Sequence, residues 1–355
     1  MYKADILLFM INVAQNIANI LSDYENNHFT SEHILDWVSQ FNPPDQAFVL
    51  EELQNIFQKT YYSKAKCTQI LKLYIEKWIK VFKYPDVPTF IAETVFLKLQ
   101  PDHKSQCELL NLLDEILVKL YNCNLRSSGR VAKQYIYLDD VLSTGQTIGR
   151  NFNEWFNLSN EFDKTKTNFH YLKDKQIKIH VCLLCGHSWG IYNTKYGLIK
   201  NIGIEVEAIL HIQAYYIIEN NIKQYNPKLN NMIPVDNQDP VIHEYLNSLK
   251  AVSKLEHAFR LSTQPHEENL FSSSVARNRL ETLFLTKGIE ILSRVGELRV
   301  EQIRPLGYTV KSHKTFGLGT LFFTYRNIPN NSPIVFWWGN NNWRPLFVLK
   351  NRGVR

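Results

Sequence analysis

The sequence predicts an α/β protein with a doubly wound, mostly parallel sheet, an N-terminal helical bundle and C-terminal helical and aromatic additions. Between about residues 93 and 212, short apolar runs alternate with helical patterns, which is typical of a parallel sheet built from βαβ units. Helical periodicity dominates before this segment, and helical patterns and aromatic residues follow it. We therefore expect a helical region over 1–90 and a sheet-containing domain over 91–355, with additions from about 240.

The first ninety residues are expected to form a small helical bundle. A first helix is indicated by apolar residues at helical spacing, namely Ile6, Met10, Val13, Ile17 and Leu21. A second helix is expected to begin at Thr30 or Ser31, and the run Asn42-Pro43-Pro44 to close it. Two further helices, over about 47–58 and 63–82, complete the bundle. Its role is either packing and partner docking or DNA binding as a helix-turn-helix, although no basic recognition face stands out.

The parallel sheet is expected from four apolar segments, over 94–99, 134–138, 177–185 and 204–212. Amphipathic stretches between them predict helices over about 106–120, 147–156 and 190–201. A polar, Asn-rich connection over 219–240 follows, and then helices near 240–260 and 275–294 and an aromatic C-terminal segment. Four strands in this order suffice for the core of a doubly wound fold.

Composition and charge indicate a folded protein of the cytoplasm. Hydrophobic residues make up 45% and aromatic residues 13% of the 355-residue chain, which is ample material for a core. The five cysteines lack disulfide-framework spacing, which suits a reducing compartment. Asp5 precedes the apolar stretch from Ile6 and Gln15 interrupts it, so we expect neither a signal peptide nor a membrane span. The net charge of +6 is compatible with phosphate or nucleic-acid ligands, but direct nucleic-acid contact is not indicated.

The most specific segment reads YLDDVLSTGQT, from Tyr137 to Thr147. An acidic pair after an apolar run occurs in the β-hairpin metal site of reverse transcriptases and in loops that hold a ribose 5-phosphate. A hairpin needs an apolar strand after the aspartates and a further metal-binding Asp on an upstream strand, and this sequence provides neither. The residues from Ser143 are suited to anion binding instead, because small residues let backbone N–H groups and hydroxyls converge on one phosphate at a helix N-terminus. An Asp-capped turn that starts a helix is the structural alternative.

This segment resembles the phosphoribosyl pyrophosphate (PRPP) signature of the class I phosphoribosyltransferases. The resemblance implies that Asp139 and Asp140 bind the ribose 2′ and 3′ hydroxyls, directly or through Mg²⁺, and form the catalytic and metal-binding pair. It also implies a cradle for the 5-phosphate, made by Ser143, Thr144, Gly145, Gln146 and Thr147.

Such enzymes need a second loop for the pyrophosphate, at the end of an earlier strand. The candidate is Gln100–Gln106, where Lys104 and Ser105 would donate to pyrophosphate oxygens with a helix N-terminus behind them. An ordinary β–α turn capped by Ser105 is the alternative.

Three other features each have a structural and a functional interpretation. Cys182 and Cys185 have CxxC spacing, but they lie in a predicted buried strand without a matching second pair, which favours core packing over zinc or redox chemistry. His187 follows that strand at the edge where open α/β sheets bind ligands, and it is either a substrate-binding residue or part of a helix start. The segment from Trp337 to Phe347 either stacks a nucleobase or forms a hydrophobic lid.

A narrower resemblance rests on several short motifs taken together. They are Lys104-Ser105-Gln106, the acidic pair with its loop, His187-Ser188-Trp189, Leu270-Phe271-Ser272-Ser273, Asn327-x-Pro329-Asn330-Asn331 and Trp343-x-Pro345-Leu346-Phe347. This set resembles the phosphoribosyltransferase-like proteins of prokaryotic conflict systems, some of which accompany retron reverse transcriptases.

The narrower resemblance implies an effector of antiviral, anti-phage defence. Such a protein would bind PRPP or a related ribose 5-phosphate nucleotide with Mg²⁺ and act at the ribose anomeric carbon. The alternative is a catalytically inactive PRPP or nucleotide sensor that partners a reverse transcriptase with its msDNA, or another defence-system protein. Neither a flexible catalytic hood nor a nucleobase pocket is recognisable in the sequence, so the acceptor is left open.

Overall fold

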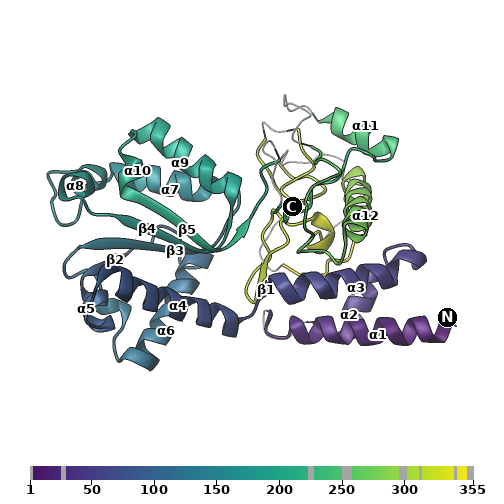
Figure 1. Cartoon of the computed structure of the whole chain (residues 1–355), viewed down its shortest axis with the longest axis horizontal. Coiled ribbons are helices and arrows are strands. Elements are labelled where there is room, and N and C mark those ends of the chain that lie inside the picture. The colour runs from purple at the N-terminus through teal and green to yellow at the C-terminus, as the bar shows by residue number, and fades with distance from the viewer. Residues whose placement is uncertain are drawn as a thin grey trace. The chain divides into compact units, whose positions relative to one another are not determined.

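The chain forms two compact units, which we call the sheet unit and the helical unit (Figure 1). The computed structural model describes residues 3–24, 29–222, 228–249, 258–295, 302–311, 314–339 and 342–349. The sheet unit comprises Ala65–Ile218, and the helical unit combines Met1–Lys64 with Glu219–Arg355. This division differs from the predicted boundary near residue 90, because the two helices that precede the sheet pack against it. Trp78 and Phe90 from those helices both contact Phe96 of the first strand.

The sheet unit alternates strands with helices. Its helices are α4 (Lys64–Phe82), α5 (Val87–Ala92), α6 (Ser105–Tyr121), α7 (Gln146–Asn157), α8 (Asn168–Lys175), α9 (Ser188–Ile202) and α10 (Val206–Ile209), with a 3-10 turn at Leu125–Ser127. Its strands are β2 (Thr94–Phe96), β3 (Gln134–Leu142), β4 (Ile179–His187) and β5 (Leu210–Ile218).

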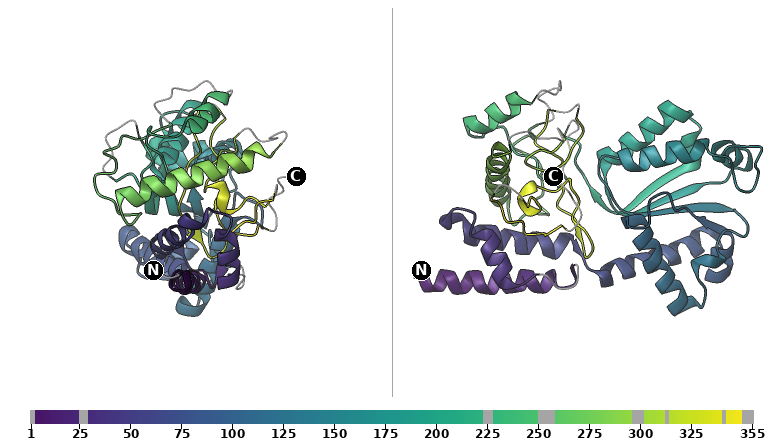
Figure 2. Two further views of the ribbon diagram at one scale, coloured as in Figure 1. Left: turned by 90° about the vertical axis from the view of Figure 1, so that its right-hand side faces the viewer. Right: turned by 180° about the vertical axis from the view of Figure 1, so that it is seen from behind.

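The four strands form one parallel sheet in the order β2-β3-β4-β5. Helices α4, α5 and α6 lie on one face, and α7, α9 and α10 on the other, as the opposite views in Figures 1 and 2 show. The central strands β3 and β4 are therefore covered on both faces, which explains why almost all of their residues are buried. The predicted α/β fold, with a parallel sheet wound on both faces, is confirmed.

Three predicted boundaries lie elsewhere in the structure. The strand predicted over 204–212 is β5, which starts only at Leu210 because Val206–Ile209 forms a short helical turn. Strand β3 continues through both aspartates, since it pairs with β4 as far as Leu142. Pro43 and Pro44 begin the next helix and do not close the preceding one, because their fixed φ and missing N–H suit a first helical turn.

The helical unit is built around a different core. Its elements are α1 (Lys3–Ile20), α2 (Ser31–Val38), α3 (Pro43–Thr60), α11 (Pro240–Ser248), α12 (Ser274–Ser293), a 3-10 turn at Ile334–Phe336, and the parallel pair β1 (Tyr61–Tyr62) and β6 (Phe323–Thr324). Thr30 caps α2 by accepting the His33 N–H at 3.2 Å, as predicted. Of the helix predicted near 240–260, residues 250–257 lie outside the described part. No helix in the described ranges is long and apolar enough to cross a membrane.

The aromatic C-terminal segment forms part of this core. Trp337, Trp338, Trp343 and Phe347 are all buried and pack in one cluster with α1, α2, α3 and α12. The Trp343 indole N–H donates to the Val335 carbonyl at 2.9 Å, so its polar group is satisfied inside the core. Buried rings of this kind serve packing and are not exposed for stacking on a nucleobase.

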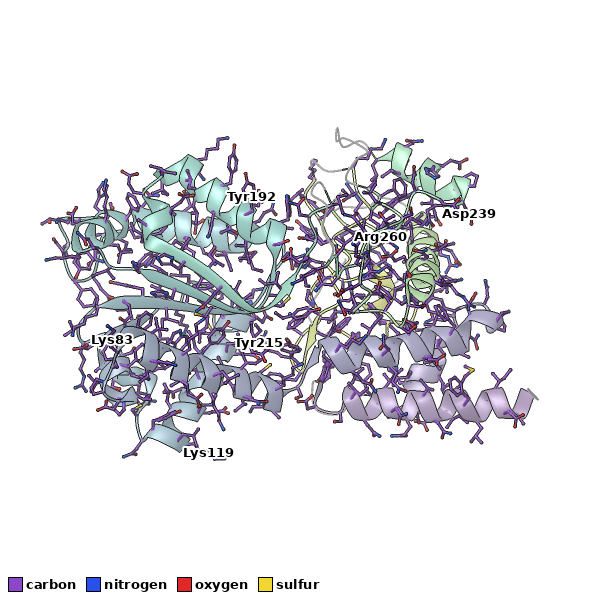
Figure 3. All side chains as sticks on the ribbon, in the orientation of Figure 1. Lys83, Lys119, Tyr192, Tyr215, Asp239 and Arg260 are labelled. Atoms are coloured by element: carbon purple, nitrogen blue, oxygen red, sulfur yellow. The ribbon has the colours of Figure 1, made fainter. Side chains whose placement is uncertain are left out.

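A buried ion-pair network connects α12 to the loops of the helical unit. Arg277 donates to Glu281 at 3.3 Å, to Glu268 and to the Leu229 carbonyl at 2.9 Å. Arg260, labelled in Figure 3, donates to the other oxygen of Glu281 at 2.9 Å. Burial raises the pKa of Glu281, whereas the two guanidinium groups oppose that rise. The network compensates the charge of a carboxylate that would otherwise be costly to bury.

Candidate functional site

The predicted site residues lie at the carboxyl edge of the parallel sheet. Lys104 and Ser105 follow β2, the phosphate segment from Ser143 follows β3, and His187 ends β4. Because the carboxyl ends of parallel strands meet at one edge, the fold collects these segments where open α/β sheets bind ligands.

Asp139 connects two of these segments through hydrogen bonds to both of its carboxylate oxygens. The Ser105 hydroxyl and the Asp140 backbone N–H donate to Oδ1, at 2.8 and 3.0 Å. The Gln100 amide and the Tyr137 hydroxyl donate to Oδ2, at 2.6 and 3.0 Å. Asp139 is only 4% exposed. The carboxylate thus ties the loop after β2 to strand β3, and the Ser105 hydroxyl points at Asp139.

Asp140 has a different environment from Asp139. It is half-buried, and its Oδ1 accepts the backbone N–H of Val141 at 2.7 Å. Asp140 is more exposed and less fully hydrogen-bonded than Asp139, so it is the better placed of the two to accept hydrogen bonds from a ligand.

The acidic pair holds a proton more readily than isolated carboxyl groups do. Burial raises the pKa of both side chains, and the charge of Asp139 adds to the rise at Asp140. At Asp139 the four donors oppose the rise, because they favour the ionised form. Burial and the charge of Asp139 together therefore favour the protonated form of Asp140.

This protonation predicts a pH dependence of stability. A carboxyl group whose pKa is raised on folding stabilises the folded state while protonated, and this contribution is lost as the pH rises from the ordinary pKa near 3.8 through the raised one. Relative to Asp140→Asn, the wild type should lose unfolding free energy as the pH rises between the two pKa values, by up to about 1.4 kcal/mol per pH unit. Urea unfolding of both proteins between about pH 4 and pH 8 measures the difference. Parallel pH profiles would contradict the prediction.

The predicted phosphate residues form a tight turn between β3 and α7. Ser143, Thr144 and Gly145 are buried, whereas Gln146 and Thr147 in the first turn of α7 are exposed. Gly145 is the N-cap of the helix and has a φ of 78°, in the left-handed region that favours glycine. The N–H groups in the first turn of α7 have no acceptor within the helix and provide an environment suited to an anion, although that of Gln146 donates to the Thr144 hydroxyl oxygen at 3.4 Å.

Helix α9 supports this turn from behind through side-chain hydrogen bonds. The Asn193 amide donates to the Thr144 carbonyl at 3.1 Å, and the Thr194 hydroxyl lies 3.4 Å from the Gly145 carbonyl. Both acceptors are backbone carbonyls. The two hydrogen bonds therefore hold the backbone of the turn and do not depend on its side chains.

The contact between the turn and α9 also depends on two glycines. A Cβ atom at Gly190 would lie 1.9 Å from the Ser143 carbonyl oxygen, and one at Gly145 would lie 2.1 Å from the Thr194 hydroxyl oxygen. Real Cβ atoms do not approach backbone oxygens this closely, so any larger residue at Gly190 must displace the turn.

The loop after β2 is held by a buried glutamine. The Gln106 carbonyl oxygen accepts the backbone N–H groups of Leu99 and Gln100, at 2.7 and 2.9 Å. Lys104 precedes α6 as its N-cap and is exposed. Gln106 thus fixes the backbone of the loop, while the charge of Lys104 lies in solvent at a helix N-terminus.

His187 and the two cysteines of β4 are buried. Burial lowers the pKa of His187 to about 3, so the imidazole is neutral near pH 7 and adds no positive charge for a phosphate. This favours the helix-start interpretation of His187. Cys182 and Cys185 lie inside the sheet, where core packing was predicted. Among the described residues, no group of three or more His, Cys, Asp or Glu could hold a metal ion.

Five residues shape this site in ways that the sequence did not predict: Gln100, Tyr137, Gly190, Asn193 and Thr194. A signal for Tyr137 existed, because residues two apart in a strand share a face, and Tyr137 is two residues before Asp139. The residues of α9 carry no local signal, since their contacts to the turn span 45 positions or more.

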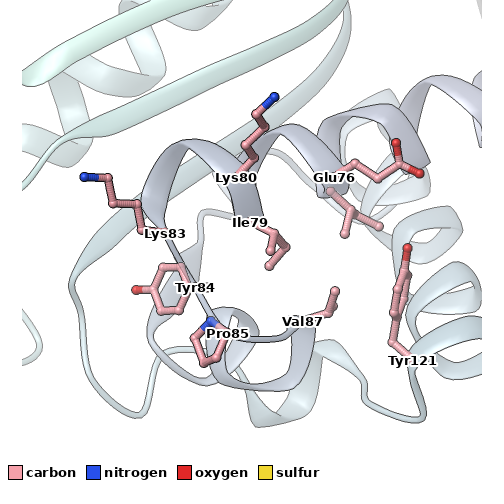
Figure 4. A pocket seen from close by; sticks show the side chains of 9 residues that line it. Glu76, Ile79, Lys80, Lys83, Tyr84, Pro85, Val87 and Tyr121 are labelled. Atoms are coloured by element: carbon pink, nitrogen blue, oxygen red, sulfur yellow. The ribbon is translucent and has the colours of Figure 1, made fainter.

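A groove of about 600 Å³ lies at the other end of the sheet unit (Figure 4). It is lined by residues of α4, of the connection from α4 to α5, of α5 and of the end of α6, among them Lys80, Tyr84 and Tyr121. The Tyr84 hydroxyl contacts Gln134, the first residue of β3. The groove therefore lies near the amino ends of the strands and is separate from the acidic pair.

A parallel sheet that carries an acidic pair at the end of one strand, followed by a glycine-dependent turn into a helix, defines a phosphoribosyltransferase-like protein. The chain belongs to the PRTase-CE family, whose model matches residues 34–348. The match extends through most of both units. No curated protein and no solved structure gives a match to the chain.

Proposed function

We propose that the chain binds PRPP or a related ribose 5-phosphate nucleotide together with Mg²⁺ and acts at the ribose anomeric carbon. The observation that supports this best is the acidic pair followed by the tight Ser143–Gly145 turn, at the carboxyl edge of the sheet. Ribose hydroxyls need acceptors and a 5-phosphate needs several donors, and the proposal gives these two tasks to the two ends of one segment.

Each part of the segment would then have its own role. Asp140 would accept hydrogen bonds from the ribose hydroxyls, while Asp139 would hold the loop after β2 in position. The backbone N–H groups of the turn and of Gln146 and Thr147 would bind the 5-phosphate, with Lys104 near the pyrophosphate. The protein contributes chiefly positioning and electrostatic stabilisation in such a reaction.

The carboxylates at this edge fit the type of Mg²⁺ site in which the ligand supplies most of the coordinating oxygens. In proteins, Mg²⁺ is usually bound by one or two carboxylates together with water and substrate phosphates. Asp139 and Asp140 could supply such carboxylate oxygens, and the ligand would supply the rest. When bound, the ion would neutralise charge on the pyrophosphate as it departs.

A second candidate is a sensor that binds the same ligand without turnover. It is favoured by the Ser105 hydroxyl, which donates to Asp139 at 2.8 Å and so is not directed at a pyrophosphate. In either form, we infer a role in antiviral defence, with a reverse transcriptase and its msDNA or another defence protein as partner. That inference rests on the resemblance to proteins of conflict systems.

Titration calorimetry with PRPP, with and without Mg²⁺, tests the proposal. We expect Mg²⁺-dependent binding with a Kd in the range usual for enzyme substrates. A pyrophosphate-release assay across nucleobases and nucleotides then separates enzyme from sensor, because only the enzyme releases pyrophosphate when acceptor and partner are present. Failure to bind PRPP, ribose 5-phosphate or a nucleotide would contradict both candidates.

A further inference from the structure

Strand β2 has an open outer edge in the sheet unit. It is the first strand of the sheet and pairs only with β3. The Leu97 N–H donates to the Ile136 carbonyl at 2.8 Å, and the Leu99 N–H donates to Gln106 at 2.7 Å. Because successive residues of an extended chain direct their backbone groups to opposite sides, the N–H and C=O groups of Phe96 and Lys98 face away from β3.

These outward groups have no partner in the described ranges, where no hydrogen bond reaches the backbone of Phe96 or Lys98 on the outer side. Two residues of a strand can offer four hydrogen-bonding groups to a neighbouring chain. An edge of this kind is a template for an added strand unless charge, proline or a covering segment blocks it.

A groove of about 580 Å³ lies directly beside this edge. The end of β2 and the segment after it, from Val95 to Leu99, form one side, the turn at Ser128 and Gly129 borders it, and α7 forms the other side. On α7, Trp155 is half-buried and Leu158 is 58% exposed. The groove thus offers apolar side chains next to open backbone groups, which is the combination that binds an extended peptide.

The charged residues around the groove indicate which charge the peptide carries. Glu154 and Glu161 line it and are both exposed. Lys98 also lines it, but its ammonium group pairs with Asp102. The remaining charge is therefore negative, which favours a peptide with Lys or Arg side chains and disfavours an acidic one.

We propose that the outer edge of β2 binds a basic, extended peptide segment of a partner protein as an additional strand of the sheet. The backbone of the peptide pairs with Phe96 and Lys98, and the side chains of every second peptide residue enter the groove. There, apolar side chains contact Trp155 and Leu158, and basic side chains approach Glu154 and Glu161. Strand addition at this edge does not require the proposed phosphoribosyl ligand.

The test measures fluorescence anisotropy of labelled heptapeptides that repeat two Lys and two Val, or two Lys and two Tyr, so that each face of the extended peptide carries both kinds of side chain. Lys98→Pro removes an outward N–H without breaking a bond to β3, and Lys98→Ala is the matched control because it keeps that N–H. We expect saturable binding that Lys98→Pro weakens by about tenfold or more, a loss of about 1.4 kcal/mol, while Lys98→Ala leaves it intact. Glu154→Lys with Glu161→Lys should also weaken it.

A second arm keeps the proposal falsifiable if Lys98→Pro does not fold. The same peptides, N-methylated either at every odd-numbered or at every even-numbered position, are added to the wild-type protein. One of the two sets must lose binding, because a strand pairs through the N–H groups of alternate residues. Binding that survives both N-methylated sets would show charge attraction without strand pairing and would overturn the proposal. Absence of saturable binding by any of the peptides would also overturn it.

Discussion

Gly190→Ala is expected to lower the affinity for PRPP by about a hundredfold or more. The added Cβ would lie 1.9 Å from the Ser143 carbonyl oxygen, so the phosphate turn must move by an ångström or more to accommodate it. Displacements of this size in a binding site cost about two orders of magnitude, because donors no longer meet the ligand at hydrogen-bonding distance. Titration calorimetry with PRPP and Mg²⁺ measures the loss.

Gly197→Ala is the matched control for this substitution. Gly197 lies in the same helix, but a Cβ there meets no atom within 4 Å. Alanine is the better helix former by about 1 kcal/mol, so this variant should be at least as stable as the wild type and bind PRPP normally. Equal affinities of the two variants would show that α9 does not position the turn.

Asp140→Asn is expected to abolish detectable PRPP binding and to make the folded protein more stable near pH 8. The substitution removes the charge that would accept the ribose hydroxyls or bind Mg²⁺, and hydrogen bonds to charged groups are worth about 1.5–3 kcal/mol each. It also removes a carboxylate that burial and Asp139 disfavour in its ionised form. Calorimetry and urea unfolding on the same preparation measure both effects. Normal PRPP binding by this variant would refute the ribose role.

Asp139→Asn should destabilise the folded protein, unlike Asp140→Asn. Comparing the two variants separates a structural role of a carboxylate from a role in ligand binding. An asparagine amide can accept at only one of the two positions where Asp139 receives pairs of donors. The unsatisfied donors should cost about 1–3 kcal/mol of unfolding free energy. A variant that loses both stability and binding marks a structural carboxylate, whereas one that loses binding alone marks a carboxylate that contacts the ligand.

The parts of the fold and site that the sequence predicted are those determined by nearby residues. Thr30 caps a helix through a residue three positions away, and Gly145 permits a left-handed turn at its own position. The acidic pair, the turn and the start of α7 follow one another along the chain, so one local pattern suggested all three.

The parts that the sequence did not predict depend on distant residues. Nothing near Gly190 indicates that its missing side chain makes room for Ser143, because the two meet only after β4 and α9 pack beside β3. The predicted start of β5 was wrong for a related reason. Apart from Glu207, Val206–Ile209 is apolar and partly β-branched, and short runs of this kind form a helical turn or a strand according to their packing.

The four hydrogen bonds on Asp139 have a consequence for any measured affinity. A ligand hydroxyl or a metal ion that uses this carboxylate must first displace a donor that the protein itself supplies, such as Ser105 or Gln100. In the free protein, these internal donors compete with the ligand for the Asp139 carboxylate. The observed Kd then reports the difference between two sets of hydrogen bonds, and Ser105→Ala could tighten binding at Asp139 even though it deletes a polar group from the site.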